Sequence, residues 1–426
     1  MNAPVASLRR NTRDWHAFAA QAFNDLRHLG FDGVGITRQA FAEGEAAAMA
    51  AVARLAEAEG LAVARDAGDN LVLSLPDEAP GPYMLVGSHL DSVPRGGNYD
   101  GAAGVLAGLI CLARMRSEGV TPPCPVRVIG LRGEESPWFG KPYIGSSALL
   151  GALRAADLGL KERGGARTLG EALASVGIDV EGVREGRPLI DKRNIAGFLE
   201  LHIEQGPVMV ARGWPTAVVT GIRGNIRYQR LVCHGRAGHS GAVPRWLRSD
   251  PVFALAELVS RLDEHWRVLL ERGLDLVVTV GVVGTDPAEH ATTRIPGEVA
   301  FSFEIRSQSH ETLEAFDVLL RTECANIARE RGVTFVFDTR QDAAPARMDE
   351  RLVGRLLAAS RRLGLPAETI ASGAGHDAAV FANAGIPAAM VFVRNENGSH
   401  NPDEAMEIDD FLAGVDLLYE TLTAGA

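Results

Sequence analysis

The stretch that decides the fold is Gly87-Ser88-His89-Leu90-Asp91-Ser92-Val93-Pro94-Arg95-Gly96-Gly97-Asn98-Tyr99-Asp100-Gly101. An apolar run at residues 84–86 precedes it and predicts a buried strand, and a second apolar run at residues 105–110 follows it and predicts a buried helix. The glycines and the proline between these runs indicate a loop. The stretch is therefore expected to lie at the end of a strand.

This loop carries one imidazole and two carboxylates, on His89, Asp91 and Asp100. Because glycine and proline let the chain turn back on itself, several of these groups can converge on one point. Neutral imidazole nitrogen and carboxylate oxygen form a ligand set that suits Zn²⁺, Mn²⁺ and other first-row divalent ions. An isolated His-x-Asp is more often a polar surface turn, so the metal interpretation depends on further residues of the chain.

Residues of the same chemistry follow three other apolar strands. Runs at residues 126–131, 198–201 and 388–393 lead into Glu134-Glu135, His202 and His400, in that order. In open α/β sheets, ligands bind outside the carboxyl ends of the strands, where these residues are expected to lie. Adjacent carboxylates after a strand point in different directions, so one can bind a metal while its neighbour acts as a general base. An acidic surface turn explains most Glu-Glu pairs, but not one accompanied by these histidines.

The length and the charge of the chain limit its class. At 426 residues it exceeds what one hydrophobic core usually supports, which predicts two domains. A formal net charge of −11 argues against nucleic acid or an anionic membrane as a partner, since both bind basic surfaces. The four cysteines lack Cys-x-x-Cys spacing, and the N-terminus lacks the pattern of a signal peptide. No apolar run reaches the ~18 residues of a membrane span. These features predict a reduced, cytoplasmic enzyme without structural disulfides.

Helical spacing of apolar residues predicts three helices in the first part of the chain, at residues 7–30, 41–60 and 102–119. Short strands are predicted at residues 61–64 and 70–75. Residues 165–195 are polar and rich in glycine, and they are assigned no element.

A segment in the second half of the chain has a different pattern. Strands are predicted there at residues 225–233, 276–283, 298–305 and 334–338, with helices that begin at Asp250-Pro251 and at residue 311. Aspartate before proline is typical of a helix N-cap with proline at the first helical position. The order β-α-β-β-α-β is that of a ferredoxin-like sandwich. We expect this segment to be a smaller domain inserted into the first.

Several motifs carry a resemblance to a known family over about residues 15–420. They are Gly87 to Val93, Gly96 to Gly101, Gly133-Glu134-Glu135, Leu201-His202-Ile203-Glu204-Gln205-Gly206-Pro207, Gly235 to Pro244, Ile295-Pro296-Gly297, Gly375-His376-Asp377-Ala378 and Gly398-Ser399-His400. With them the sequence resembles the di-metal aminoacylase and carboxypeptidase-like hydrolases. The motif His-Ile-Glu-Gln-Gly-Pro is specific to the branch that holds N-carbamoyl-L-amino-acid hydrolases, β-ureidopropionases and allantoate amidohydrolases.

The resemblance implies an α/β fold. It consists of a mixed-sheet, di-zinc peptidase-like catalytic domain and an inserted ferredoxin-like α+β domain that serves as lid and dimerisation domain. We expect the catalytic domain at residues 1–214 and 331–426 and the inserted domain at residues 215–330. The implied assembly is a homodimer.

The resemblance also implies two divalent metal ions, Zn²⁺ or alternatively Mn²⁺, Co²⁺ or Ni²⁺. His89 and His202 would bind one ion, Glu135 and His400 the other, and Asp100 both. Asp91 would hold His89 in its tautomer by a hydrogen bond. Glu134 would take a proton from the attacking water and deliver it to the leaving nitrogen. His239 would donate a hydrogen bond to the oxyanion, across the dimer interface.

Four residues are implied on the substrate side: Gln205, Thr293, Arg306 and His376. Arg306 occupies the place where relatives keep an arginine that binds the substrate carboxylate, although an ion pair with Glu304 or Glu298 is the alternative. Relatives commonly have asparagine in place of Thr293 and Gly-Thr-Thr-Pro-Met in place of residues 241–245. These departures leave the metal chemistry intact and the substrate identity open.

The sequence therefore predicts a metal-dependent amidohydrolase that cleaves a linear amide or ureido C–N bond next to a carboxylate-bearing carbon. N-carbamoyl-L-amino acids are the leading small-molecule substrates. Allantoate, ureidoglycolate and N-acyl amino acid conjugates are alternative substrates for the same mechanism. A catalytically silent binding protein of the same fold is the alternative of another class, and the presence of every ligand residue and of Glu134 argues against it.

Overall fold

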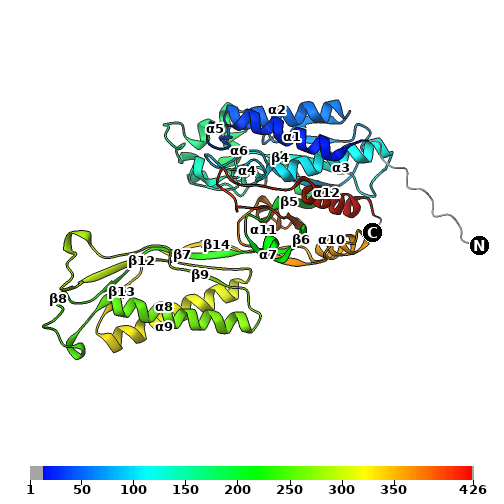
Figure 1. Ribbon diagram of the computed structural model, residues 1–426. Coiled ribbons are helices and arrows are strands. Elements are labelled where there is room, and N and C mark those ends of the chain that lie inside the picture. The colour runs from blue at the N-terminus through cyan, green and yellow to red at the C-terminus, as the bar shows by residue number, and fades with distance from the viewer. Residues whose placement is uncertain (1–12, 425–426) are drawn as a thin grey trace, which may run out of the picture. The chain divides into compact units, whose positions relative to one another are not determined.

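The structure is a computed structural model that describes residues 13–424 (Figure 1). These residues form two units. Unit 1 comprises the described residues up to Thr220 and those from Arg347 onward, and unit 2 comprises Gly221–Ala346. Unit 2 covers most of the segment expected at residues 215–330 and extends past it, because the strands Thr334–Val336 and Gln341–Ala343 pair with its own sheet.

Unit 1 is built on a nine-stranded sheet with the strand order β1-β2-β4-β3-β5-β17-β6-β15, in which β16 also pairs with β6. The strands are β1 (Ala62–Arg65), β2 (Leu71–Ser74), β3 (Tyr83–His89), β4 (Val126–Leu131), β5 (Ile195–Ile203), β6 (Thr216–Ile222), β15 (Ala346–Arg347), β16 (Thr369–Ser372) and β17 (Ala388–Val393). The four central strands β4, β3, β5 and β17 are parallel, whereas β2 and β6 flank them in antiparallel pairing. The carboxyl ends of the parallel strands therefore meet at one edge of the sheet.

Helices pack on both sides of these strands. The longer ones are α1 (Trp15–Gly30), α2 (Glu43–Ala58), α3 (Ala102–Glu118), α10 (Glu350–Arg362) and α12 (Ile408–Thr423), and α11 (Asp377–Asn383) is shorter. The predicted helix at residues 7–30 begins at Trp15, because the Asp14 carboxylate caps it by accepting the Ala17 backbone N–H; residues 7–12 lie outside the described range. Helix α3 is almost entirely buried, which explains its apolar sequence.

The segment 165–195, which received no element from the sequence, contains helices. Helices α5 (Leu169–Ser175) and α6 (Val180–Arg184) and a 3₁₀ turn at Lys192–Asn194 lie here, and α4 (Ile144–Leu149) and α7 (Val208–Arg212) are similarly short. A reciprocal capping box between Thr168 and Glu171 starts α5. Helices of five to seven residues complete too few turns to show apolar periodicity, which is why the pattern was missed.

Unit 2 has a separate sheet with the order β10-β12-β7-β13, in which every pair is antiparallel. Its elements are β7 (Gly224–His234), α8 (Pro251–Glu271), β9 (Val277–Thr279), β10 (Val283–Gly284), β12 (Glu298–Ser307), α9 (His310–Arg331), β13 (Thr334–Val336) and β14 (Gln341–Ala343). Helices α8 and α9 pack together against this sheet (Figure 1). Order and connectivity are those of a ferredoxin-like sandwich, so the predicted fold class is confirmed for both sheets.

Two local features of unit 2 test the reading of its sequence. The Asp250 carboxylate accepts hydrogen bonds from the backbone of Val252 and Phe253 at the start of α8, as the Asp-Pro pair predicts. The single strand predicted at residues 276–283 is wrong, because it is divided into β9 and β10. The pairs Thr279–Glu304 and Val283–Phe301 differ by one residue in register, so a bulge interrupts the ladder.

None of the helices within residues 13–424 combines the length and the apolar character that a membrane crossing needs.

Candidate metal centre

The predicted ligands lie at the edge where the parallel strands end. His89 is the last residue of β3, and His202 is the penultimate residue of β5. Glu135 follows β4, and His400 lies in the loop after β17. Asp100 precedes the first turn of α3, on the loop that β3 leads into. Neighbouring parallel strands thus carry residues from four distant parts of the sequence to one place.

Asp100 lies between the histidines of this edge. Its Oδ1 is 3.5 Å from His89 Nε2 and 3.1 Å from His202 Nε2. Its Oδ2 is 3.5 Å from His400 Nε2, which is also 3.5 Å from Glu135 Oε1. The five residues form two groups of three that share Asp100, with the ligand atoms of each group within 4.8 Å of one another.

The histidine contacts favour a proton on Nδ1 of His89 and of His202. His202 Nδ1 is 2.9 Å from the Ile203 carbonyl oxygen, and its Nε2 accepts the backbone N–H of Gly101 at 3.3 Å. His89 Nδ1 is 3.2 Å from the Asp91 carbonyl oxygen. With one proton on each Nδ1, Nε2 is the nitrogen that faces Asp100 and that would bind an ion.

Buried oxygens without a partner support the same conclusion. Glu135 Oε1 and Gln205 Oε1 are among the buried polar atoms that have no hydrogen-bond partner in the described chain. A buried carboxylate oxygen without a donor is costly. Since Glu135 Oε1 faces His400 Nε2 across 3.5 Å, the donor set fits a divalent ion that both atoms would bind.

The electrostatics of the site also favour bound cations. Burial raises the pKa of Glu134 and of Glu135 well above the ordinary value, and the negative charge of Glu135 adds to the shift at Glu134. Burial opposes ionisation of Asp100 too, but the neighbouring His202 and His89 hold the pKa of Asp100 well below its usual range. Without a metal, this excess of carboxylates can be relieved only by protons.

Asp91 has a wider role than its predicted contact with His89. Its Oδ1 lies 3.3 Å from His89 Nδ1 and accepts the backbone N–H of Glu134 at 3.0 Å. Its Oδ2 accepts the backbone N–H of Glu135 at 3.1 Å. One fully buried carboxylate therefore positions a histidine of one strand end and both glutamates of the next.

Arg38 is a residue near the site that the sequence analysis missed. Its guanidinium is fully buried and donates from Nε to the Leu90 carbonyl at 2.8 Å and from Nη1 to Asn98 Oδ1 at 3.3 Å. Burial lowers its pKa, and the charges of Glu404 and Asp91 oppose that shift. Arg38 thus binds two residues of the loop between β3 and α3, which we call the ligand loop. No motif at the position of Arg38 in the chain indicates this.

Gln205 and His376, expected on the substrate side, both lie beside the predicted ligands. Gln205 Nε2 donates to Asp100 Oδ2 at 2.7 Å, and the Gln205 backbone has a φ of 62°, a strained conformation for this residue type. The His376 ring lies 4.4 Å from the His202 ring, and its Nε2 is 3.0 Å from Ser372 Oγ. Burial lowers the pKa of His376 well below its ordinary value, so this ring is neutral.

The remaining predicted residues lie in unit 2. His239 is exposed on β8 (Gly238–His239), which pairs with β11 (Arg294–Ile295), and the Thr293 carbonyl accepts the backbone N–H of Ser240 at 2.8 Å. This two-stranded ribbon brings His239 and Thr293 together. Arg306 lies on β12, and its guanidinium is 3.1 Å from Glu304 Oε1.

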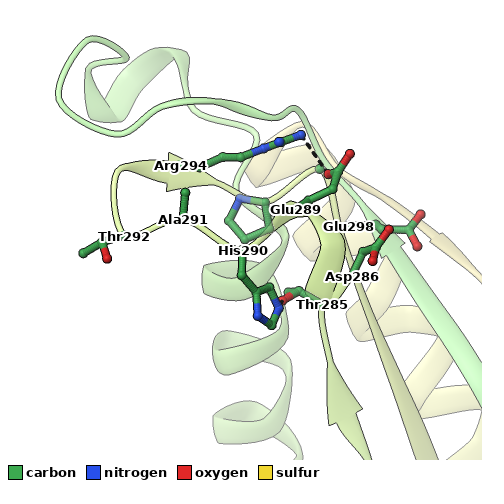
Figure 2. Close-up of a pocket in the computed structure, with 10 residues that line it drawn as sticks. Thr285, Asp286, Glu289, His290, Ala291, Thr292, Arg294 and Glu298 are labelled. Atoms are coloured by element: carbon green, nitrogen blue, oxygen red, sulfur yellow. Dashed lines mark hydrogen bonds and ion pairs between the residues drawn. The ribbon is translucent and has the colours of Figure 1, made fainter.

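A surface hollow of about 390 Å³ lies beside the same ribbon (Figure 2). Its lining includes Thr285, Asp286, Glu289, His290, Arg294 and Glu298. Four of its polar residues pair with one another: Thr285 Oγ1 is 2.7 Å from His290 Nε2, and Arg294 donates to Glu289 at 2.8 Å. The predicted ligands are all in unit 1, so this hollow is not the candidate metal centre.

Metal removal should destabilise the protein. An ion that binds only the folded chain stabilises it by about 2.7 kcal/mol when its free concentration is 100 times the dissociation constant. We expect a chelator to lower the thermal unfolding temperature, and Zn²⁺ or Mn²⁺ to restore it in a dose-dependent way. Differential scanning calorimetry measures both steps. Identical unfolding temperatures for chelated and metal-supplied protein would contradict a metal site.

The metal-free protein should lose stability as the pH rises from about 4 to 7. Burial, aided by the charge of Glu200, raises the pKa of Asp377 from 3.8 to about 7. Because the folded state binds this proton more tightly, the stabilisation is complete below pH 3.8 and is lost as the pH rises through about 7. Asp377→Asn should flatten that part of the pH dependence, because an amide does not titrate there. Asp377 Oδ2 has no hydrogen-bond partner that the amide would disturb.

Urea unfolding of the metal-free proteins at pH 5 and pH 8 measures the effect, with Asp263→Asn, at an exposed position of α8, as the matched control. The same decrease in wild type and Asp377→Asn would assign the pH dependence to other groups.

Comparisons of the sequence and of the structure find similar hydrolases among known proteins. The model of peptidase family M20/M25/M40 matches residues 85–424. An N-carbamoyl-L-amino acid amidohydrolase of Geobacillus stearothermophilus is 34% identical over 390 residues, which cover 91% of this chain and 93% of the relative. An allantoate amidohydrolase of Escherichia coli (strain K12) is 31% identical over 342 residues, 80% of each chain. The crystal structure of a hydantoinase/carbamoylase family amidase from Burkholderia multivorans superposes with a TM-score of 0.85 at 28% identity, covering 96% of this chain and 97% of that one.

Proposed function

The chain belongs to peptidase family M20/M25/M40, in its hydantoinase/carbamoylase branch, and on that premise we propose that it is a two-metal amidohydrolase acting on N-carbamoyl-L-amino acids. The observation that carries the proposal is the pair of ligand groups that share Asp100, with Glu134 beside them. The relatives over most of the chain are hydrolases of C–N bonds. The bond cleaved here is a linear amide or ureido bond next to a carboxylate-bearing carbon.

In this proposal the five ligand residues hold two ions. His89 and His202 would bind one, Glu135 and His400 would bind the other, and Asp100 would contribute to both groups. When bound, the ions polarise the scissile carbonyl and make a water molecule nucleophilic at neutral pH. Zn²⁺ is the expected ion, and Mn²⁺, Co²⁺ and Ni²⁺ suit the same ligands, because affinity at His and carboxylate sites follows availability as well as geometry.

Glu134 is the proposed general base. It belongs to neither ligand group, yet its Oε2 is only 3.9 Å from His89 Nε2. Its buried position beside the first ligand group suits a carboxylate that accepts a proton from water and then passes it to the leaving nitrogen. The bond from its backbone N–H to Asp91 holds it in place while the side chain changes protonation state.

The proposal assigns oxyanion stabilisation to His239 of unit 2, acting on the site of a partner subunit in a homodimer. An exposed imidazole whose Nδ1 accepts the Gly241 backbone N–H keeps Nε2 available as a donor. The loss of one oxyanion donor costs about 10²–10³ in turnover.

A mixing experiment tests the transfer between subunits. Glu134→Gln and His239→Ala subunits, each inactive alone, should regain up to a quarter to a half of wild-type activity when they exchange into heterodimers. Subunit exchange is followed with differently tagged chains. Exchange without any recovery of activity would place His239 outside the partner's site.

Substrate choice separates the main proposal from its alternative. A second candidate, an amidohydrolase of allantoate, ureidoglycolate or N-acyl amino acid conjugates, is supported by the allantoate amidohydrolase relatives at 31% identity. We expect N-carbamoyl-L-amino acids to give the highest kcat/KM in a panel of these substrates, measured by release of the free amine. A higher kcat/KM for allantoate would replace the first proposal with the second, and no turnover of any of them by metal-loaded protein would favour a silent binding protein.

A further inference from the structure

The loop after β17 contains a buried carboxylate that the proposed mechanism does not use. Glu404 is 7% exposed, and it follows His400 by four residues. Its Oε1 accepts the backbone N–H of Tyr99 at 2.8 Å and that of Asp100 at 3.2 Å. Residues about 300 positions apart in the chain are thereby joined at the shared ligand.

The backbone at Gly97 lies close against the Glu404 carboxylate. A Cβ on Gly97 would lie 2.0 Å from the Glu404 carboxyl carbon and 2.1 Å from its Oε1. Only glycine allows the ligand loop to approach the carboxylate this closely. The second glycine of the Gly96-Gly97 pair is therefore required by packing against Glu404.

Ser399 makes a second connection between the same two loops. Its Oγ lies 2.5 Å from Asp100 Oδ2 and 2.5 Å from Glu404 Oε2. Glu404 thus holds the backbone of Asp100. Ser399, which is adjacent to His400, holds the side chain of Asp100. The position of the shared carboxylate is tied at both ends to the loop that carries His400.

This tie matters more for one ligand group than for the other. His202 is 1% exposed and lies within the strand β5, where pairing with Phe392 of β17 fixes it. The His400 side chain is 52% exposed, and its backbone has a φ of 61° in a loop. The bonds of Asn397 and Asn401 lie within this loop, whereas those of Glu404 and Ser399 join it to Asp100. His400 Nε2 is also 3.4 Å from Gln205 Nε2.

We propose that Glu404 is a positioning residue that places His400 against Asp100 and thereby sets the affinity of the second ion, the one bound by Asp100, Glu135 and His400. This inference rests on the proposed two-metal function. Glu404 itself is not expected to touch substrate or ion. Residues that orient metal ligands typically contribute 10–100-fold in metal affinity.

Titration of metal-free protein with Co²⁺, followed by visible absorption and by isothermal calorimetry, tests the proposal. Wild type should bind two equivalents. Glu404→Ala should bind the first with an affinity within a few-fold of wild type and the second 10–100-fold more weakly. The matched control is Glu407→Ala, three residues along the same segment, where the side chain is exposed and makes no capping bond.

The conservative variant Glu404→Gln should rescue the second ion. Its amide oxygen can accept from Tyr99 and Asp100, and its amide nitrogen can donate to Ser399 Oγ, which leaves the Ser399 hydrogen for Asp100. If Glu404 only stabilised the fold, Glu404→Ala would change the affinities for the two ions alike. Glu404→Gln would then have no reason to restore the Co²⁺ absorption of the second site.

Wild-type affinity for both ions in Glu404→Ala, or equal weakening of both, would overturn the positioning role while leaving the two-metal function in place. Wild type that binds fewer than two ions would overturn the proposed function itself and this inference with it. If Glu404→Ala does not fold, Ser399→Ala carries the test, because it keeps the bonds of Glu404 to the backbone and removes the two contacts of the Ser399 hydroxyl, with Asp100 Oδ2 and with Glu404 Oε2. Unchanged affinity for the second ion in Ser399→Ala would then contradict the proposal.

Discussion

Glu134→Gln should lower turnover by about 10²–10⁴ while both ions remain bound. Glutamine has the shape of glutamate but cannot accept a proton from water, so the reaction loses its base. The backbone N–H of residue 134 still donates to Asp91, and residue 134 belongs to neither ligand group, so the metal centre should keep its geometry. Steady-state kinetics together with metal analysis by mass spectrometry measure the two effects separately.

The adjacent Glu135 provides the matched control. Its Oε1 is unpartnered and lies 3.5 Å from His400 Nε2, so Glu135→Ala should lose one of the two ions and lose activity as a consequence. Excess metal should partly restore Glu135→Ala and should not restore Glu134→Gln. If Glu134→Gln retained turnover within a few-fold of wild type, or lost metal as Glu135→Ala does, the assignment of base and ligand would be wrong.

For substrates that carry a carboxylate, Arg306→Ala should lower kcat/KM by a factor that corresponds to a free energy of about 2–5 kcal/mol. A guanidinium can bind a carboxylate through two parallel charge-assisted hydrogen bonds. In the structure Arg306 is paired with Glu304 at 3.1 Å, the alternative that the sequence leaves open. Glu304 also accepts a hydrogen bond from Arg227 Nε at 3.0 Å, so it keeps a partner if Arg306 turns to a substrate.

Neutral analogues and a second arginine distinguish substrate binding from a structural role. The loss for Arg306→Ala should be much smaller on the amide or ester of the same substrate, because no buried carboxylate is then left unpaired. Arg227→Ala, which removes the other partner of Glu304, should affect acids and neutral analogues alike. Equal losses on both types of substrate in Arg306→Ala would show that this residue does not recognise the carboxylate.

Local patterns predicted much of the fold. The long helices and the buried strands have strong apolar patterns, and the Asp250-Pro251 pair located the start of α8, because capping depends on a few adjacent residues. Weaker patterns failed where an element is short or a ladder is irregular. The helices within residues 165–195 and the bulge between β9 and β10 are the examples.

The sequence by itself determined which side chains follow the strands, and with them the set of candidate ligands. Residue type and position next to an apolar run are local properties, so His89, Glu135, His202 and His400 could all be selected without a structure. Their convergence follows from the parallel pairing of the strands that carry them.

Only the tertiary structure decided what orients these ligands. The bond from Arg38 to Leu90 spans 52 positions of the chain and the bond from Tyr99 to Glu404 spans 305, and neither has a local pattern. The backbone donors that meet Asp91 and Glu404 exist in almost every residue, so they carry no signal in the sequence. They become specific only when folding buries them, because a buried donor must find an acceptor and the acceptor must come from whatever segment packs beside it.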